Sequence, residues 1–167
     1  MRKIILIVNE IVIFSTITLF TTSTGIFSQI KTAPNFALYN INGKRFVFYN
    51  ILGMLPQKGI VILNFTSIYC KPCRKEIPEL LSISERSNRV KLICIYAESG
   101  DPVKDNAREL NVSGKSYVDP FGSIRLKFNV KKIPVTFIID KSRTILGRFE
   151  GYTEENLISI RRIIVGK

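Results

Sequence analysis

Histidine and tryptophan are absent from this chain of 167 residues, and cysteine occurs only three times. Without histidine, neither a Ser–His nor a Cys–His nucleophile can be built. Structural zinc sites usually take four Cys or His ligands, so a zinc site of the usual kind is excluded too. The cysteines therefore serve redox chemistry or none, and we expect neither a metal nor a cofactor.

Acidic residues are also scarce, with 13 Asp and Glu against 25 Lys and Arg, a net charge of +12. Such a balance can indicate a nucleic acid, an anionic membrane or an acidic partner. The cations are scattered and no nucleic-acid motif accompanies them, so we predict a solvated basic surface. Apolar residues make up 46% of the chain, enough for the core of a single domain.

The first 28 residues are typical of an export signal. A positive start, Met1-Arg2-Lys3, is followed by an apolar and Thr-rich run that ends at Phe27. Glu10 is unusual within such a run. The run is also nearly long enough to span a bilayer, so residues 1–28 are either a cleaved signal peptide or a membrane anchor. Both alternatives place the remaining domain, residues 33–167, in an extracytoplasmic compartment such as the periplasm.

The central motif is Cys70-Lys71-Pro72-Cys73, between a predicted buried strand at residues 60–65 and a helical pattern that follows. Two thiols at this spacing can close a small disulfide ring or stand open as a dithiol. The N-terminal thiol lies near the unpaired N–H groups and the positive end of the helix dipole, which favour a thiolate. The motif therefore predicts a redox-active pair.

Glu76 is the exception to the amphipathic pattern of this helix. At 100° per residue, the apolar side chains fall on one arc with Cys73, and Glu76 is the charged residue on that arc. Burial should raise its pKa and let it exchange a proton with a neighbouring thiol. The alternative is an acid at the start of a helix that only offsets the dipole or reaches solvent.

The rest of the chain predicts a mixed α/β order. A hairpin is expected around Asn42-Gly43, followed by a loop with a single helical turn over residues 49–58. Cys94 lies in a predicted strand and is interpreted as a small buried hydrophobe. Further strands are expected at 90–96, 116–118, 133–140 and 144–150, and helices at 101–110, 123–128 and after Thr153.

Together these residues resemble the thioredoxin superfamily, with CxxC at a helix start and Ile133-Pro134 before a later strand. The chain is most similar to the TlpA/ResA-like extracytoplasmic thiol–disulfide oxidoreductases. Asn64 stands where cytosolic thioredoxins carry a buried Asp, while Glu76 and the segment 98–128 match the buried acid and the central insertion of the TlpA/ResA-like family. The resemblance implies a thioredoxin fold, in which helices flank a central mixed sheet with an N-terminal β-hairpin and a strand–helix insertion.

The chain departs from this family at two positions. Tyr69 stands where a Trp usually precedes the first cysteine, and Lys71 replaces a Gly or an acidic residue. With its basic neighbours, Lys71 should make the site electropositive and favour the Cys70 thiolate. These neighbours are Arg74, Lys75, Lys131 and Lys132.

The resemblance also implies roles. Cys70 would attack a substrate disulfide, Cys73 would resolve the mixed disulfide to leave a Cys70–Cys73 disulfide, and Glu76 would help to deprotonate Cys73. Substrate contacts would come from Tyr69, Lys71, Pro72, Ile133 and Pro134, the last in a cis peptide bond. The expected partners are exported proteins with disulfides and an upstream reductant, membrane-bound or extracytoplasmic. We expect a monomer that binds no nucleic acid.

Three other functions remain open. A peroxiredoxin shares the fold, and Ser67 lies three residues before Cys70 as its motif requires, but Leu63 occupies the place of its upstream proline. A binding module with a permanently closed disulfide is the non-enzymatic alternative. A protein that binds membranes or nucleic acid through its basic surface is the least favoured.

Overall fold

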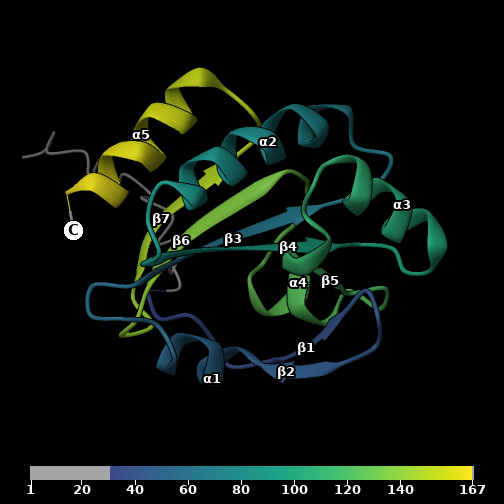
Figure 1. Cartoon of the computed structure of the whole chain (residues 1–167), viewed down its shortest axis with the longest axis horizontal. Coiled ribbons are helices and arrows are strands. Elements are labelled where there is room, and N and C mark those ends of the chain that lie inside the picture. The colour runs from purple at the N-terminus through teal and green to yellow at the C-terminus, as the bar shows by residue number, and fades with distance from the viewer. Residues whose placement is uncertain (1–30, 167) are drawn as a thin grey trace, which may run out of the picture.

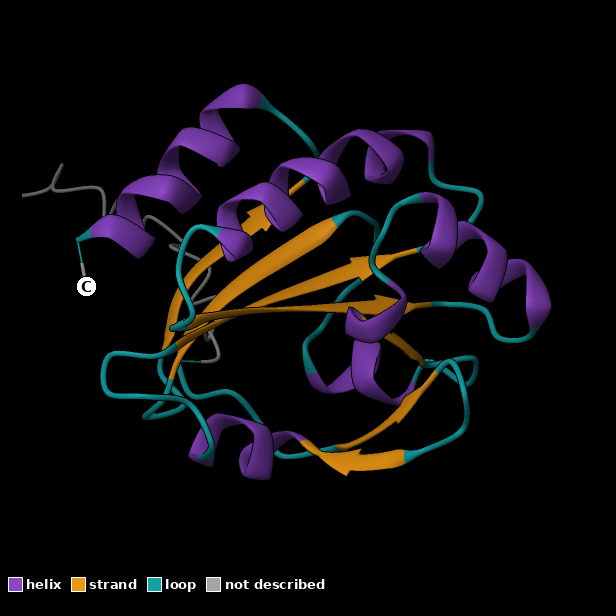
Figure 2. Ribbon diagram, viewed as in Figure 1, coloured by secondary structure: helices purple, strands orange, loops and turns teal. Residues whose placement is uncertain are grey.

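The structure, a computed structural model, describes residues 31–166. Within these residues the strands form a seven-stranded mixed sheet in the order β2-β1-β5-β4-β3-β6-β7 (Figures 1 and 2). The expected signal peptide or anchor at residues 1–28 lies outside the described part of the chain. Among the described helices, none has the length and hydrophobicity that a membrane crossing requires.

The predicted order of elements is confirmed, including the N-terminal hairpin and the strand–helix insertion between β4 and β6. The strands are β1 (Ala37–Asn40), β2 (Arg45–Val47), β3 (Ile60–Thr66), β4 (Val90–Tyr96), β5 (Ser116–Val118), β6 (Val135–Asp140) and β7 (Ile145–Glu150). The helices are α1 (Phe48–Gly53), α2 (Lys71–Glu85), α3 (Asp101–Glu109), the short 3-10 helix η1 (Ser113–Lys115), α4 (Ser123–Lys127) and α5 (Glu154–Val165).

Two boundaries differ from the sequence-based expectation. Helix α1 begins at Phe48, one residue before the loop with a helical turn that was expected over residues 49–58, because the side chains of Phe48, Ile51 and Leu52 pack into the core from one helix face. Strand β6 begins at Val135 rather than at Ile133. Proline has no N–H to give to a ladder, so Pro134 stands before the paired residues instead of among them.

Strand β3 is buried along its whole length and carries a hydrophobic core on each face of the sheet. Ile60 and Ile62 pack under α2, α3 and α5, while Val61, Leu63 and Phe65 face α1 and α4. Such a strand reads as a continuous apolar run because helices cover both faces of the sheet (Figure 2). The one polar residue in the middle of this run is Asn64, which lies on the α2 face.

The register fixes two edges of the sheet that matter below. Strand β3 is parallel to β4, with Thr66 beside Tyr96, and antiparallel to β6, with Phe65 beside Val135. The carboxyl ends of β3 and β4 and the start of β6 therefore form one edge, the carboxyl edge. The starts of β3 and β4 and the β6–β7 turn form the other, the amino edge, on the left in Figure 1.

The insertion is closed by a carboxylate at the carboxyl edge. Asp119 is buried, and its oxygens accept hydrogen bonds from the Ser123 hydroxyl and from the N–H groups of Ile124 and Arg125. The first N–H groups of a helix have no partner within it, so a side chain that accepts from them stabilises the helix. Asp119 thereby holds α4 against the end of β5.

We predict that Asp119→Ala lowers the free energy of unfolding by about 1–2 kcal/mol, because buried N–H donors of α4 lose their acceptor. Urea denaturation followed by circular dichroism measures this difference. Asp105→Ala is the control, since Asp105 is exposed and forms only a surface ion pair with Arg108. Equal losses in the two variants would show that the Asp119 hydrogen bonds do not stabilise the fold.

Candidate functional site

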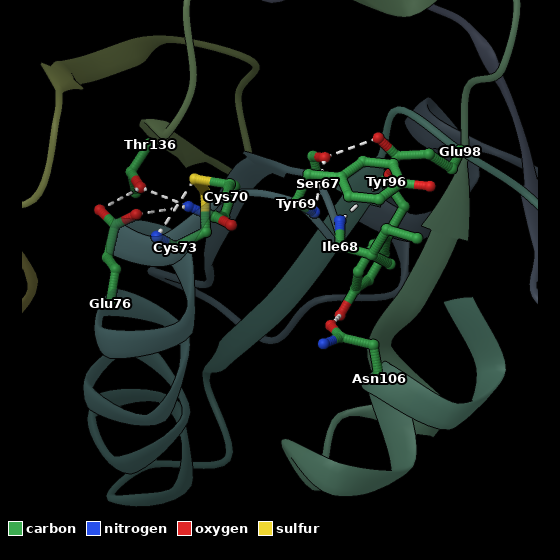
Figure 3. The surroundings of a disulfide bond; sticks show 11 residues. Ser67, Ile68, Tyr69, Cys70, Cys73, Glu76, Tyr96, Glu98, Asn106 and Thr136 are labelled. Atoms are coloured by element: carbon green, nitrogen blue, oxygen red, sulfur yellow. Dashed lines mark hydrogen bonds between the residues drawn. A yellow bond between two sulfur atoms is a disulfide. The ribbon is translucent and has the colours of Figure 1, made fainter. Parts of the chain in front are cut away.

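The two cysteines of the CxxC motif form a disulfide at the carboxyl edge, with an S–S distance of 2.00 Å (Figure 3). Cys70 is the N-cap of α2, and its Sγ accepts a hydrogen bond from the Cys73 N–H at 3.2 Å. Pro72 fits the first turn of α2, where a missing N–H costs nothing. Cys70 keeps 9% exposure and Cys73 none, so Cys70 is the more accessible of the two sulfurs.

Glu76 lies one helical turn after Cys73 and is only 1% exposed. Both carboxyl oxygens accept hydrogen bonds at 2.9 Å, Oε2 from the Asn64 amide and Oε1 from the Thr136 hydroxyl. The same amide nitrogen also donates to the Thr136 hydroxyl oxygen at 2.9 Å. A closed triangle of side chains from α2, β3 and β6 therefore holds the carboxyl group on the disulfide side of the helix (Figure 3).

Burial raises the pKa of Glu76 to about 7, although the hydrogen bonds from Thr136 and Asn64 act in the opposite direction. Removal from water disfavours the charged form more than two neutral donors favour it. The helical pattern predicted that Glu76 is buried, and this prediction is confirmed. The alternative, in which Glu76 reaches solvent, is wrong. Glu76 can exchange a proton near neutral pH.

Thr136 was missed as a site residue by the sequence reasoning. Thr136 lies within the strand predicted over residues 133–140, and its neighbours in β6, Val135 and residues 137–139, are apolar. The pairing of β6 with β3 identifies Thr136 as a site residue, because Thr136 lies directly beside Asn64 in this antiparallel ladder. Polar residues that face each other in two buried strands indicate a shared hydrogen-bonded partner.

A second carboxylate holds the segment that leads into Cys70. Glu98 follows β4 and accepts hydrogen bonds from the Ser67 hydroxyl at 2.6 Å and from the Ile68 N–H at 3.2 Å. The Ser67 oxygen in turn accepts from the Tyr69 N–H at 3.1 Å (Figure 3). Sequence reasoning assigned Glu98 only to the start of the insertion. Here it fixes the backbone directly before the disulfide.

Residues expected to contact a substrate are exposed around the disulfide or border it. Tyr69 is 82% exposed, and Lys71 and Pro72 are exposed beside it on the first turn of α2. Ile133 is half-buried, and the peptide bond between Ile133 and Pro134 is cis. Because Val135 pairs with Phe65, both of these residues lie at the carboxyl edge, where β3 leads toward the motif.

The expected excess of positive charge near the motif is partly offset. Arg74 forms an ion pair with Glu109 of α3, and Glu98 adds a carboxylate on the other side of the segment before Cys70. Lys71, Lys75, Lys131 and Lys132 are exposed. In residues 31–166, no group of three acidic or cysteine side chains gathers as a metal site would require.

Cys94 is fully buried in β4, next to Asn64 across the parallel ladder. Burial raises the pKa of its thiol to about 12. The thiolate is the reactive form of cysteine, so this thiol is unreactive at neutral pH. The interpretation of Cys94 as a small buried hydrophobe agrees with both observations.

Known thiol–disulfide oxidoreductases are similar to this chain in sequence and in fold. The AhpC/TSA family matches residues 30–148. The thiol-disulfide oxidoreductase ResA of Bacillus thuringiensis is 30% identical over 131 residues, which cover 76% of this chain and 73% of that protein. A thioredoxin-family thiol:disulfide interchange protein from Chlorobium tepidum aligns with a TM-score of 0.65 at 24% identity, over 81% of this chain and 94% of that one. StoA from Bacillus subtilis aligns at 0.60 and 21% identity, over 80% and 98%. The predicted thioredoxin fold is confirmed.

We predict that the free energy of unfolding falls as the pH rises from 4.5 to about 7. Glu76 keeps its proton up to about pH 7 in the folded protein but loses it near 4.5 when unfolded. In this window the unfolded chain binds fewer protons, so stability falls by roughly 3 kcal/mol in total and then levels off.

Urea midpoints between pH 4 and pH 8 measure this slope in the wild type and in Glu76→Gln. The amide resembles the protonated carboxyl in shape and also has a single acceptor oxygen, and the variant lacks the component of the slope that comes from Glu76. Identical slopes in the two proteins would contradict the raised pKa of Glu76.

Proposed function

The chain belongs to the AhpC/TSA family of the thioredoxin superfamily and is similar to its ResA-type thiol–disulfide oxidoreductases, and we propose that it reduces disulfides of exported proteins through Cys70 and Cys73. The observation that carries the proposal is the Cys70–Cys73 disulfide at the N-terminus of α2, one turn from the buried carboxyl of Glu76. This arrangement supplies an accessible sulfur, a resolving sulfur and a proton acceptor.

In the reduced protein, Cys70 is the nucleophile. Its thiolate attacks one sulfur of the substrate disulfide, forms a mixed disulfide and expels the other substrate sulfur as a thiolate. The N-terminal N–H groups and dipole of α2 favour the Cys70 thiolate before the attack. The Cys73 N–H, which already points at the Cys70 sulfur at 3.2 Å, is one of these donors.

Cys73 then completes the reaction. It transfers its proton to Glu76, and the resulting thiolate attacks the Cys70 sulfur, which closes the Cys70–Cys73 disulfide and releases the second substrate thiolate. Two electrons pass from the protein to the substrate. Cys73 has no exposed surface, so a buried proton acceptor near pH 7 is the group able to take its proton.

Substrate binding is assigned to the residues that surround the exposed side of Cys70. Tyr69 offers an aromatic face, Lys71 and Pro72 border the disulfide on α2, and Ile133 and Pro134 present the chain before β6. Pro134 is buried and its carbonyl already accepts a hydrogen bond from the Gly151 N–H at 2.9 Å, so pairing with an extended peptide, a common mode of peptide recognition, is assigned to the backbone of the half-buried Ile133. Thr136 and Asn64 act through Glu76, as positioning residues.

The site works outside the cytoplasm in this proposal. Residues 1–28 have the positive start and apolar run of an export signal or anchor, and residues 33–167 form the thioredoxin-like domain. In an oxidising compartment the Cys70–Cys73 disulfide must be reopened by a dedicated reductant, which is either a membrane protein or another extracytoplasmic dithiol. The domain acts as a monomer.

We predict that reduced Cys73→Ser accumulates a stable mixed disulfide with a disulfide-containing peptide, because the resolving thiol is gone, whereas Cys70→Ser forms none. Mass spectrometry after acid quenching detects the adduct. Cys94→Ser is the control, and it should exchange as fast as the wild type because its thiol is buried.

The equilibrium of the wild-type Cys70–Cys73 pair in glutathione buffers, read by alkylation and mass shift, tests the direction. A potential below that of glutathione supports a reductase, and a potential near that of strong oxidants would reverse the direction. Turnover of hydrogen peroxide without a disulfide substrate would identify a peroxidase instead. No exchange at all would leave a binding module.

A further inference from the structure

Basic side chains gather at the amino edge, at the opposite end of the strands from the CxxC motif. The loop before β3 and the β6–β7 turn meet there, since the Lys141 N–H donates to the Gly59 carbonyl at 3.0 Å. The Arg89 guanidinium joins the same edge to the end of α5, donating to the carbonyls of Lys58 and Ile164. Lys58, Lys141 and Gly166 line one shallow hollow of this surface.

The amino edge carries more positive than negative charge. Its exposed or half-buried cations are Lys31, Lys58, Arg86, Lys91, Lys141 and Arg143. Of the acids nearby, Glu85 is paired with Lys115, and Asp140 accepts hydrogen bonds from Ser142 and from the Thr144 N–H. A net positive surface of this kind attracts an anionic one.

Two large apolar side chains stand out from the same edge. Met54, directly after α1, is 71% exposed, and Val165, at the end of α5, is 81% exposed. The next residue along the chain places each of them at the amino edge. Leu55, after Met54, accepts a hydrogen bond from the Lys141 ammonium through its carbonyl, and Gly166, after Val165, lines the hollow beside Lys58. Apolar side chains among cations are typical of surfaces that touch the headgroup layer of a bilayer.

The chain also enters the domain at this edge. The Ala33 N–H donates to the Arg143 carbonyl at 2.8 Å, and the Ile145 N–H donates to the Lys31 carbonyl at 2.9 Å. Phe27, the last residue of the apolar run in the sequence, precedes Lys31 by four positions, which span at most about 14 Å. Because this span is an upper limit, a link that is not fully extended can bring the amino edge within the screening length of about 8 Å over which exposed charges act at physiological salt.

We propose that the amino edge rests on an anionic bilayer surface, with the apolar run before Lys31 retained as the anchor and the disulfide directed away from the lipid. The proposal rests on the extracytoplasmic location proposed above, but it does not depend on the redox reaction. Strand β3 has seven residues and crosses the domain from one edge to the other, so it separates the site from the lipid by about 23 Å.

The absence of tryptophan provides the test, because a single introduced Trp reports its own surroundings. Full-length Val165→Trp carries the reporter at the amino edge, and Phe121→Trp carries it after β5, at an exposed position on the carboxyl side. Both proteins are reconstituted into vesicles of phosphatidylcholine with phosphatidylglycerol, part of it carrying brominated acyl chains. Bromine quenches Trp fluorescence only at close range.

We expect the fluorescence of Val165→Trp to be roughly halved in anionic vesicles and that of Phe121→Trp to stay unchanged, because contact surfaces enter the headgroup layer by only about 5–10 Å. Replacing Lys58, Lys91 and Arg143 by Gln should abolish the quenching, since each cation near the surface changes the association roughly fivefold. The matched control replaces Lys75, Lys131 and Lys132, the same loss of charge at the carboxyl edge, and leaves quenching intact.

Three quenching results would overturn the proposal. These are an unquenched Val165→Trp in vesicles that carry the chain, equal quenching of the two reporters, and equal quenching of Val165→Trp in vesicles of phosphatidylcholine alone. A chain that does not float with vesicles would refute the anchor and the docked edge together. Thiol exchange measured on the same samples separates any of these failures from a failure of the oxidoreductase function.

Discussion

The buried carboxyl of Glu76 is the constraint on which the rest of the site depends. A carboxyl group removed from water is tolerated only when its oxygens find donors, and these donors come from two strands that flank α2 at its start. The fold must therefore bring β3, β6 and α2 into a fixed arrangement before the group can be buried. The same arrangement places Cys73 one helical turn from Glu76. The packing that buries Glu76 therefore also sets the pKa of the carboxyl group next to the disulfide.

A second carboxylate, Glu98, organises the opposite side of the motif. Glu98 is hydrogen-bonded to the segment before Cys70, while Glu76 lies after Cys73. The disulfide therefore lies between a carboxyl group that holds the backbone and a buried carboxyl group whose pKa is raised to about 7. The first is partly exposed and the second almost fully buried. Environment rather than residue type separates the two roles.

The sequence predicted the fold class, the redox pair and the buried acid because each leaves a local pattern. The apolar run of β3, the CxxC motif at a helix start and the position of Glu76 on the helical wheel are all visible within about 20 residues. Thr136 and Glu98 are different, because their partners lie 60 and 31 residues away along the chain. Only strand pairing and the return of β4 beside β3 bring them to the motif. Helix α1 began earlier than predicted because tertiary packing of its apolar face outweighed local strand propensity.

The burial of Cys94 has a consequence for folding under oxidising conditions. Three thiols allow three different single disulfides, and only the pairing of Cys70 with Cys73 is native. While β4 is unfolded, Cys94 is as reactive as the others and can be captured in a wrong crosslink. Once β4 takes its place beside β3, the odd thiol is sealed in the core. Pairing of β4 with β3 therefore removes Cys94 from thiol exchange and leaves Cys70 and Cys73 as the thiols that can form a disulfide.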